Sequence, residues 1–259
     1  MADLQALIFD VDGTLADTER DGHRVAFNMA FEKAGLDWIW SVERYGQLLK
    51  VTGGKERIRY YLDEFNQGFK CPENLDEFIA ELHASKTIFY TKLLAEGSIP
   101  LRTGVMRLIN EAREAGLRLA IATTTTPANV AALLQHSMAA DAENWFEVIA
   151  AGDIVPAKKP ASDIYDLTLK QMNLSAQACL AFEDSHNGIL SSMAAGLATI
   201  ITVNDYTREH DFNGAALVLD HMGEPDQPFK VLAGNAYHSS CLDLDLLKKI
   251  HLSSAGITD

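Results

Sequence analysis

The sequence predicts an α/β fold: a doubly wound parallel sheet with an all-helical domain inserted after the first strand. Along most of the 259 residues, short apolar runs alternate with amphipathic helical patterns, and glycine follows several of the helices. Strands and helices that alternate in this way form βαβ units and a parallel sheet. The stretch 17–97 breaks the alternation, because it contains helical patterns and no convincing strand. We therefore expect a core domain from residues 1–16 and 98–259 and a helical domain from residues 17–97.

The first strand is expected at 4–9, an apolar run that stops at Asp10 and is followed closely by Gly13. Such a run, bounded by a turn, is typical of a buried strand. Similar runs predict strands at 117–122, 148–151, 179–182 and 198–203, and helices between them at 105–115, 128–138, 163–172 and 187–195. Helices are expected in the insert at 23–34, 42–49, 56–65 and 75–95, and near the end of the chain at 242–251.

Composition and charge exclude several classes of function. Hydrophobic residues make up 47% of the chain, which is enough for a buried core and argues against a disordered tether. The formal net charge of −14 argues against a surface for nucleic acid or an anionic membrane, although one local basic pocket can still bind a small phosphorylated molecule. Cys71, Cys179 and Cys241 are far apart, which favours free thiols in a reducing compartment. With no signal peptide and no long apolar run, we expect a cytoplasmic protein that does not enter membranes. We also expect a monomer.

Asp10 and Asp12 directly follow the first strand, in the run Asp10-Val11-Asp12-Gly13-Thr14. Ligands of a doubly wound sheet bind at the carboxyl ends of its strands. Two carboxylates at this place can divide the labour of phosphoryl transfer, since one can attack phosphorus while the other moves protons at the leaving oxygen. Gly13 permits the turn that brings the second carboxylate back over the site. The alternative is an ordinary turn, because Asp and Gly are common turn residues.

Three further strand ends carry polar residues that this chemistry requires. Thr123 and Thr124 follow the strand at 117–122, where a hydroxyl can bind a phosphoryl oxygen or, alternatively, cap the next helix. Lys159 follows the stretch 148–155, and an ammonium held there would neutralise the phosphoryl group, although a lone lysine is usually a surface residue. Glu183 and Asp184 follow the strand at 179–182, where charge is costly unless it is paired or binds a metal, and the alternative for Asp184 or Ser185 is a helix N-cap. With Asp10 they predict an oxygen-rich site suited to Mg²⁺.

The motifs Asp10-x-Asp12-Gly13-Thr14, Thr123, Lys159-Pro160 and Glu183-Asp184 together resemble the haloacid dehalogenase superfamily of phosphotransferases, over about 4–219. The resemblance implies a Rossmann-like core with the helical insert as a mobile cap. It implies that Asp10 is the nucleophile and Asp12 the general acid and then base. It also implies that Mg²⁺ is bound by Asp10, the backbone carbonyl of Asp12, Asp184 and, directly or through water, Glu183, and that Thr123 and Lys159 bind the transferring phosphoryl group.

A narrower resemblance lies in the insert. Asp17-Thr18-Glu19, His23, Tyr45, Thr52-Gly53-Gly54-Lys55-Glu56-Arg57 and Lys86 are similar to the CbbY-like branch, which includes sugar-bisphosphate phosphatases. The resemblance implies that Glu19, His23, Tyr45, Lys55, Arg57 and Lys86 bind substrate. Lys55 and Arg57 suit a distal phosphate, because guanidinium and ammonium groups form charge-assisted hydrogen bonds to it. The alternative for these two is a solvated helix start, and for Lys86 it is a surface position on a long helix.

The resemblance implies a Mg²⁺-dependent phosphatase that acts on a small sugar phosphate, with xylulose-1,5-bisphosphate as the best candidate. A phosphomutase of the β-phosphoglucomutase type is the first alternative, because it uses the same core and differs in what accepts the phosphoryl group. A non-catalytic sugar-phosphate sensor is the alternative from another class. One departure from many relatives is Arg102-Thr103-Gly104, where they have Pro-Gly. We expect this change to loosen a turn and to leave the catalytic residues untouched.

Overall fold

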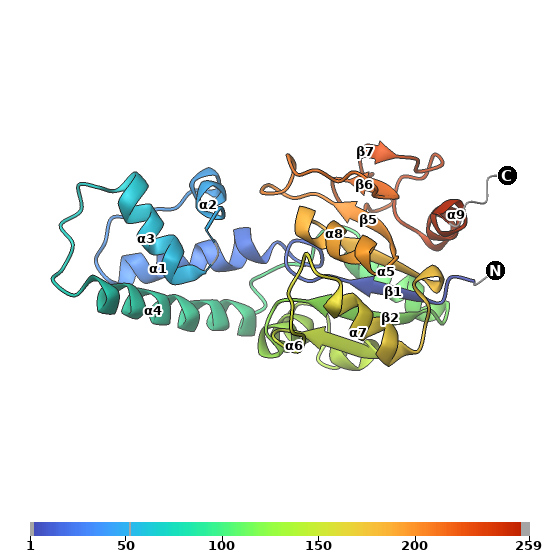
Figure 1. Cartoon of the computed structure of the whole chain (residues 1–259), viewed down its shortest axis with the longest axis horizontal. Helices are drawn as coiled ribbons and strands as arrows, with labels where there is room; N and C mark the ends of the chain where they lie inside the picture. The colour runs from blue at the N-terminus through green and yellow to red at the C-terminus, as the bar shows by residue number, and fades with distance from the viewer. Residues whose placement is uncertain (1–2, 52, 255–259) are drawn as a thin grey trace. The chain divides into compact units, whose positions relative to one another are not determined.

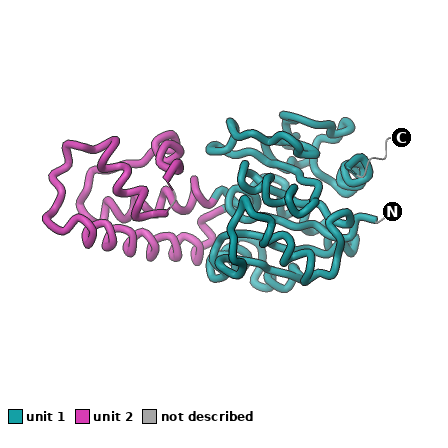
Figure 2. Tube along the Cα trace, in the orientation of Figure 1, with its two compact units in different colours: residues 1–17, 100–259 teal, residues 18–99 magenta. Residues whose placement is uncertain are grey.

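The computed structural model describes residues 3–51 and 53–254 (Figure 1). The chain divides into two compact units, one formed by residues 1–17 and 100–259 and the other by residues 18–99 (Figure 2). We call them the α/β unit and the helical unit. These boundaries lie within two residues of those expected from the alternation of strands and helices.

The described strands of the α/β unit form one mixed sheet. Among the described residues, seven strands follow the order β3-β2-β1-β4-β5-β6-β7, parallel except for the antiparallel edge strand β7. Their bounds are Ala6–Phe9 (β1), Arg118–Thr123 (β2), Val148–Ala151 (β3), Cys179–Glu183 (β4), Ala198–Thr202 (β5), Leu217–Leu219 (β6) and Val231–Gly234 (β7). The central strands β1, β2 and β4 are buried apolar runs, as strands covered on both faces must be.

Helices cover both faces of this sheet (Figure 1). Their bounds are Val105–Glu114 (α5), Pro127–Ser137 (α6), Asp163–Met172 (α7), His186–Ala194 (α8) and Leu244–Ser254 (α9), with short 3₁₀ turns at Ala142–Trp145 and Ala176–Ala178. Right-handed crossovers to either side of β1 place α5 on one face and α7 and α8 on the other. Side chains of α7 such as Ile164 and Tyr165 pack onto Ile8, Ala120 and Ala181 of the sheet. The doubly wound α/β fold predicted from the sequence is thereby confirmed.

The strand register aligns the ends of the central strands. Phe9 of β1 lies opposite Ile121 of β2 and Phe182 of β4, and the Phe9 and Phe182 rings stack at 4.5 Å. The residues that follow β1, β2 and β4 therefore reach the same edge of the sheet. This edge is where a doubly wound sheet binds its ligand.

The helical unit consists of a π-helical turn at Thr18–His23 followed by α1 (Arg24–Lys33), α2 (Val42–Leu48), α3 (Gly54–Phe65) and α4 (Leu75–Ala95). Helices α1 and α4 pack along each other, and an aromatic cluster around Phe27, Phe31 and Trp40 fills the interior. Ser41 and Asn74 cap α2 and α4, since each side chain accepts a hydrogen bond from the backbone N–H three residues later.

Most expected elements lie within a few residues of their observed bounds, and α4 and α7 begin and end where the sequence places them. Two strands escaped the sequence analysis, β6 and β7, which complete one side of the sheet beyond β5. In the part of the chain that the structure describes, no helix is both long and apolar enough to span a membrane.

Candidate active site

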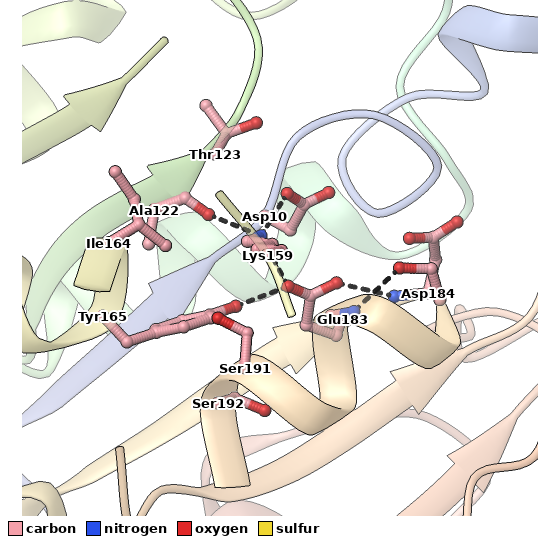
Figure 3. A network of polar contacts seen from close by, with 12 residues as sticks. Asp10, Ala122, Thr123, Lys159, Ile164, Tyr165, Glu183, Asp184, Ser191 and Ser192 are labelled. Atoms are coloured by element: carbon pink, nitrogen blue, oxygen red, sulfur yellow. Dashed lines mark hydrogen bonds and ion pairs between the residues drawn. The ribbon is translucent and has the colours of Figure 1, made fainter. Parts of the chain in front are cut away.

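Buried carboxylates meet at the edge of the sheet where β1 and β4 end (Figure 3). Asp10, Glu183 and Asp184 are exposed by only 7%, 1% and 6%. One oxygen from each lies within 4.8 Å of the others. Such a cluster needs positive charge, because burying a carboxylate without a partner is costly.

Lys159 supplies one positive charge at the centre of this cluster. Its Nζ donates hydrogen bonds to Asp10 Oδ1 at 2.7 Å, to Glu183 Oε1 at 2.6 Å and to the carbonyl of Ala122 at 2.9 Å (Figure 3). Burial alone would lower the pKa of Lys159, but Asp10 and Glu183 outweigh it and raise the pKa. The ammonium therefore stays charged at neutral pH and faces the proposed nucleophile.

The carboxylates still carry more negative charge than Lys159 offsets. Burial, reinforced by the charge of Asp10, raises the pKa of Glu183 to about 7, although Lys159 and the Tyr165 hydroxyl oppose the change. Burial and the charges of Asp10 and Glu183 raise the pKa of Asp184 well above its usual value. Hard oxygen ligands with surplus charge are what a divalent cation such as Mg²⁺ requires, so these residues fit a metal site.

Two glycines make room for the acidic pair at the end of β4. Gly13 adopts a φ of +87°, and a Cβ there would lie 2.2 Å from Asp184 Oδ2. A Cβ on Gly188, in the first turn of α8, would lie 1.9 Å from Glu183 Oε2. Both positions are therefore restricted to glycine by the close approach of a carboxylate.

Asp12 lies in the turn after β1, and its Oδ2 accepts a hydrogen bond from the Thr125 hydroxyl. Thr123 is buried at the end of β2, and its Oγ1 accepts a hydrogen bond from the Thr125 N–H at 3.3 Å. Thr124 is exposed. Thr125, a residue between the expected phosphate ligands and the helix, thus connects the Asp12 carboxyl to the end of β2.

The helical unit holds a second polar cluster. Arg57 Nη1 donates to the Tyr45 hydroxyl at 2.6 Å, and that hydroxyl donates to Glu19 Oε2 at 2.5 Å. Lys86 Nζ lies 2.8 Å from His23 Nδ1. Arg57 and Lys86 are each only 8% exposed, which is rare for cations unless they are paired or bind an anion. The structure therefore brings together five of the six residues expected from the insert.

Lys55 is the exception, because its side chain is exposed at the start of α3. Thr52, the first residue of the motif that contains Lys55, lies outside the described residues. Among the described residues of that motif, Arg57 alone turns into the interior, where its guanidinium lies 3.7 Å from Glu19 Oε2 and over the Tyr45 ring.

Comparisons with known proteins agree with this geometry. A model of the haloacid dehalogenase-like hydrolases matches residues 4–196. The plasmid protein CbbY of Cupriavidus necator is 47% identical over 252 residues, which cover 96% of this chain and 97% of that protein. The chain belongs to the haloacid dehalogenase-like hydrolase family, in its CbbY branch.

Solved structures of the CbbY branch share the fold. Rhodobacter sphaeroides CbbY in complex with phosphate is 46% identical, with a TM-score of 0.68 over 84% of this chain and 94% of that chain. A mutant of the same protein, in complex with xylulose-(1,5)bisphosphate, is 45% identical with the same TM-score and coverage. This chain is therefore an enzyme, a hydrolase of the haloacid dehalogenase-like family.

The sequence analysis did not identify three residues that contact the carboxyl groups of this site. Tyr165 donates to Glu183 Oε1 at 2.6 Å, Asn204 donates to Asp184 Oδ2 at 2.7 Å, and Thr125 donates to Asp12. Asn204 carried a usable signal, because it follows the end of β5 at the same edge of the sheet. Tyr165 carried none, since an aromatic residue in an amphipathic helix is more simply explained as part of the core.

The burial of His23 predicts that the stability of the protein depends on pH. Burial first, then the nearby charges of Lys86, Arg57 and His83, lower the pKa of His23 to about 4, although Glu19 opposes the shift. Below pH 6.5 the unfolded chain gains a proton that the folded chain does not take up until about pH 4. Stability should therefore fall by up to about 3 kcal/mol as the pH drops from 6.5 to 4.

Urea unfolding of the wild type and His23→Gln between pH 7 and pH 4 measures this contribution. The glutamine can still accept a hydrogen bond from Lys86 but cannot titrate, so its stability should fall less over this range. His136→Gln, a change at an exposed histidine on α6, serves as the control and should follow the wild type. Identical pH profiles for wild type and His23→Gln would contradict the prediction.

Proposed function

We propose that this hydrolase is a Mg²⁺-dependent phosphatase that removes phosphate from a sugar bisphosphate through an aspartyl-phosphate on Asp10. The observation that carries the proposal is the buried Asp10 carboxylate held by Lys159 beside the acids of β4. An ammonium at this place can neutralise both the attacking carboxylate and the phosphoryl group. The relative from R. sphaeroides in complex with xylulose-(1,5)bisphosphate supports that sugar bisphosphate as the first candidate substrate.

The first step forms the phosphoenzyme. A carboxylate oxygen of Asp10 attacks the phosphorus in line, the bond from phosphorus to the ester oxygen breaks, and the Asp12 carboxyl gives its proton to the departing sugar alkoxide. Lys159 and Thr123 bind oxygens of the phosphoryl group during the transfer. Asp12 follows Asp10 in the turn after β1, and the Thr125 hydroxyl orients the Asp12 carboxyl by donating a hydrogen bond to it.

The second step hydrolyses the phosphoenzyme and regenerates the free enzyme. Asp12, now a carboxylate, takes a proton from a water molecule that attacks the phosphorus, and the bond between phosphorus and Asp10 breaks to release inorganic phosphate. Asp10, Asp184, the backbone carbonyl of Asp12 and Glu183, directly or through water, would hold Mg²⁺, which supplies positive charge against the phosphoryl oxygens. Glu183 is otherwise held by Lys159 and Tyr165.

The helical unit supplies the groups proposed for the second phosphate. Arg57 and Lys86 are buried cations that contact the Tyr45 hydroxyl and the His23 ring, and Arg57 Nη1 also lies 3.7 Å from Glu19 Oε2. Burial makes a charge-assisted hydrogen bond to phosphate stronger than it would be at the surface. Lys55, being exposed, is a weaker candidate than its position in the motif implies.

A phosphate-release screen over pentose and hexose mono- and bisphosphates tests the proposed function. We expect the highest kcat/KM for a bisphosphate, with xylulose-1,5-bisphosphate first. Formation of an isomerised sugar phosphate in place of free phosphate would show that the chain is a mutase. Absence of turnover on every ester would favour the sugar-phosphate sensor.

Arg57→Met should lower kcat/KM for the bisphosphate by about ten- to a hundredfold, because a charge-assisted contact contributes roughly 1.5–3 kcal/mol. p-Nitrophenyl phosphate has no second phosphate, so its cleavage should change much less. Arg59→Met is the matched control: Arg59 lies two residues further along α3, is exposed and pairs with Asp76. Equal losses on both substrates for Arg57→Met would show that Arg57 supports the fold and does not select the substrate.

A further inference from the structure

Arg102 lies beside the catalytic loop, although the sequence presents it only as a departure from the pattern of many relatives. It follows Leu101, which pairs with Ala16, and its own N–H donates to the carbonyl of Leu15 at 2.9 Å. The side chain is only 7% exposed. A guanidinium buried to this extent must be matched by acceptors, since an unmatched buried charge is costly.

The acceptors are mainly backbone carbonyls at the ends of different strands. Nη1 donates to the carbonyl of Gly13, and to the carbonyl and hydroxyl of Thr202 at 2.9 and 3.0 Å. Nη2 donates to the carbonyls of Val203 and Asp220, the latter at 2.9 Å. Nε lies 3.3 Å from Asp17 Oδ1. One planar group thus joins the turn after β1 to the segments that follow β5 and β6.

Two of these contacts lead directly to the proposed catalytic and metal-binding groups. The Gly13 carbonyl belongs to the residue after Asp12, and Gly13 is the glycine that lies against Asp184. The Val203 carbonyl belongs to the peptide bond with Asn204, whose side chain donates to Asp184 Oδ2. Displacing the guanidinium would therefore release the turn that carries Asp12 and the residue that orients Asp184.

We propose that Arg102 is a positioning residue for phosphoryl transfer: it holds the turn that contains Asp12 and the backbone of Asn204 in place. The proposal rests on the proposed phosphatase function. It depends on the planar fork of arginine, because the compact ammonium of lysine cannot reach carbonyls on several strands at once. It also predicts that replacing Arg102 impairs proton transfer by Asp12 more than it impairs substrate binding.

The test compares Arg102→Lys and Arg102→Met with the wild type on a sugar phosphate and on p-nitrophenyl phosphate. On the sugar phosphate, kcat should fall by about ten- to a hundredfold in both variants with little change in KM, because a small displacement of an acid–base group costs up to about that much. p-Nitrophenolate leaves without a proton from Asp12, so phosphoenzyme formation from this ester should continue. Hydrolysis of the phosphoenzyme still needs Asp12, so rapid mixing should show a burst of p-nitrophenol followed by slow turnover.

Arg107→Met is the matched control. Arg107 of α5 donates to the carbonyl of Gly223 at 2.8 Å and pairs with Glu224 and Glu111, outside the proposed catalytic groups. It should lower the melting temperature without lowering kcat. Should Arg102→Met fail to fold, Arg102→Lys, which keeps the charge and most of the volume, gives the same measurements.

The possible outcomes separate the proposals. Wild-type kcat in Arg102→Lys would overturn the positioning role, because charge alone would then suffice. Equal losses on both esters without a burst, or an equal loss of kcat in Arg107→Met, would also overturn it in favour of a general structural role. Absence of phosphate release by the wild type from every ester would overturn the proposed function, and the positioning role with it.

Discussion

Asp10→Asn is expected to abolish phosphate release from every ester, by at least about a thousandfold, while the chain stays folded. An amide nitrogen and oxygen occupy nearly the same volume as the carboxylate but cannot form an acyl phosphate. Lys159 keeps Glu183 and the Ala122 carbonyl as partners after the change, so the ammonium is not left unpaired. Phosphate release measures the loss of turnover, and covalent labelling of the protein by phosphate measures the loss of the acyl phosphate.

Stability provides the control for this substitution. Because the cluster carries surplus negative charge, removing one carboxylate should leave the melting temperature in metal-free buffer unchanged or higher. Asp166→Asn, at an exposed position of α7, should change neither activity nor stability appreciably. Comparable phosphate release by folded Asp10→Asn and wild type would show that Asp10 is not the nucleophile.

The catalytic edge of the sheet was predictable because parallel strands bring sequence-distant residues to one place. Asp10, Lys159, Glu183 and Asp184 were each weak signals by themselves, yet each follows an apolar run. The structure brings the three carboxyl groups together, and Lys159 pairs with Asp10 and Glu183. A period-two or continuous apolar pattern is a local property, which is why the central strands were found. β7 is an apolar run, Val231-Leu232-Ala233-Gly234, but it has only four residues and lies exposed at the edge of the sheet, so it lacks the longer pattern by which the central strands were found.

Contacts that span the chain were not predictable in the same way. Arg102 reaches Gly13 and Asp220 across long sequence separations, and no local pattern distinguishes such an arginine from an exposed one.

The burial of Lys86 and Arg57 in the helical unit could have been inferred from the sequence. Lys86 lies on the stripe Ile79, Leu82, Lys86, Tyr90, Leu94 of α4, whose spacing of three and four residues marks an inward face. Arg57 precedes Ile58 and Leu62 on the buried side of α3, whereas Lys55 does not share it.

Removal of divalent cations is expected to lower turnover by at least about a thousandfold, which corresponds to about 4 kcal/mol of lost transition-state stabilisation. The reason is electrostatic: Asp10, Glu183 and Asp184 crowd within 4.8 Å, and a phosphate dianion would add to their charge with only Lys159 to oppose it. EDTA should abolish phosphate release and Mg²⁺ should restore it. Ca²⁺ should restore much less, because its larger and more irregular coordination sphere fits in-line attack poorly.

Binding of Mg²⁺ should also be visible without turnover. A cation that binds only the folded chain stabilises it by about 2.7 kcal/mol at a concentration one hundred times its Kd, so the melting temperature should rise with added Mg²⁺. Asp184→Asn should lose both this rise and the activity, since it keeps the hydrogen bond from Asn204 but removes one anionic ligand. Asp166→Asn should keep both. An undiminished Mg²⁺-dependent rise in Asp184→Asn would mean that Asp184 is not a ligand of the cation. Full activity of the wild type in metal-free buffer would mean that the surplus charge is offset by protonation. The pKa of Asp184, which burial and its neighbours raise, would then be the reason that the cluster tolerates three carboxyl groups.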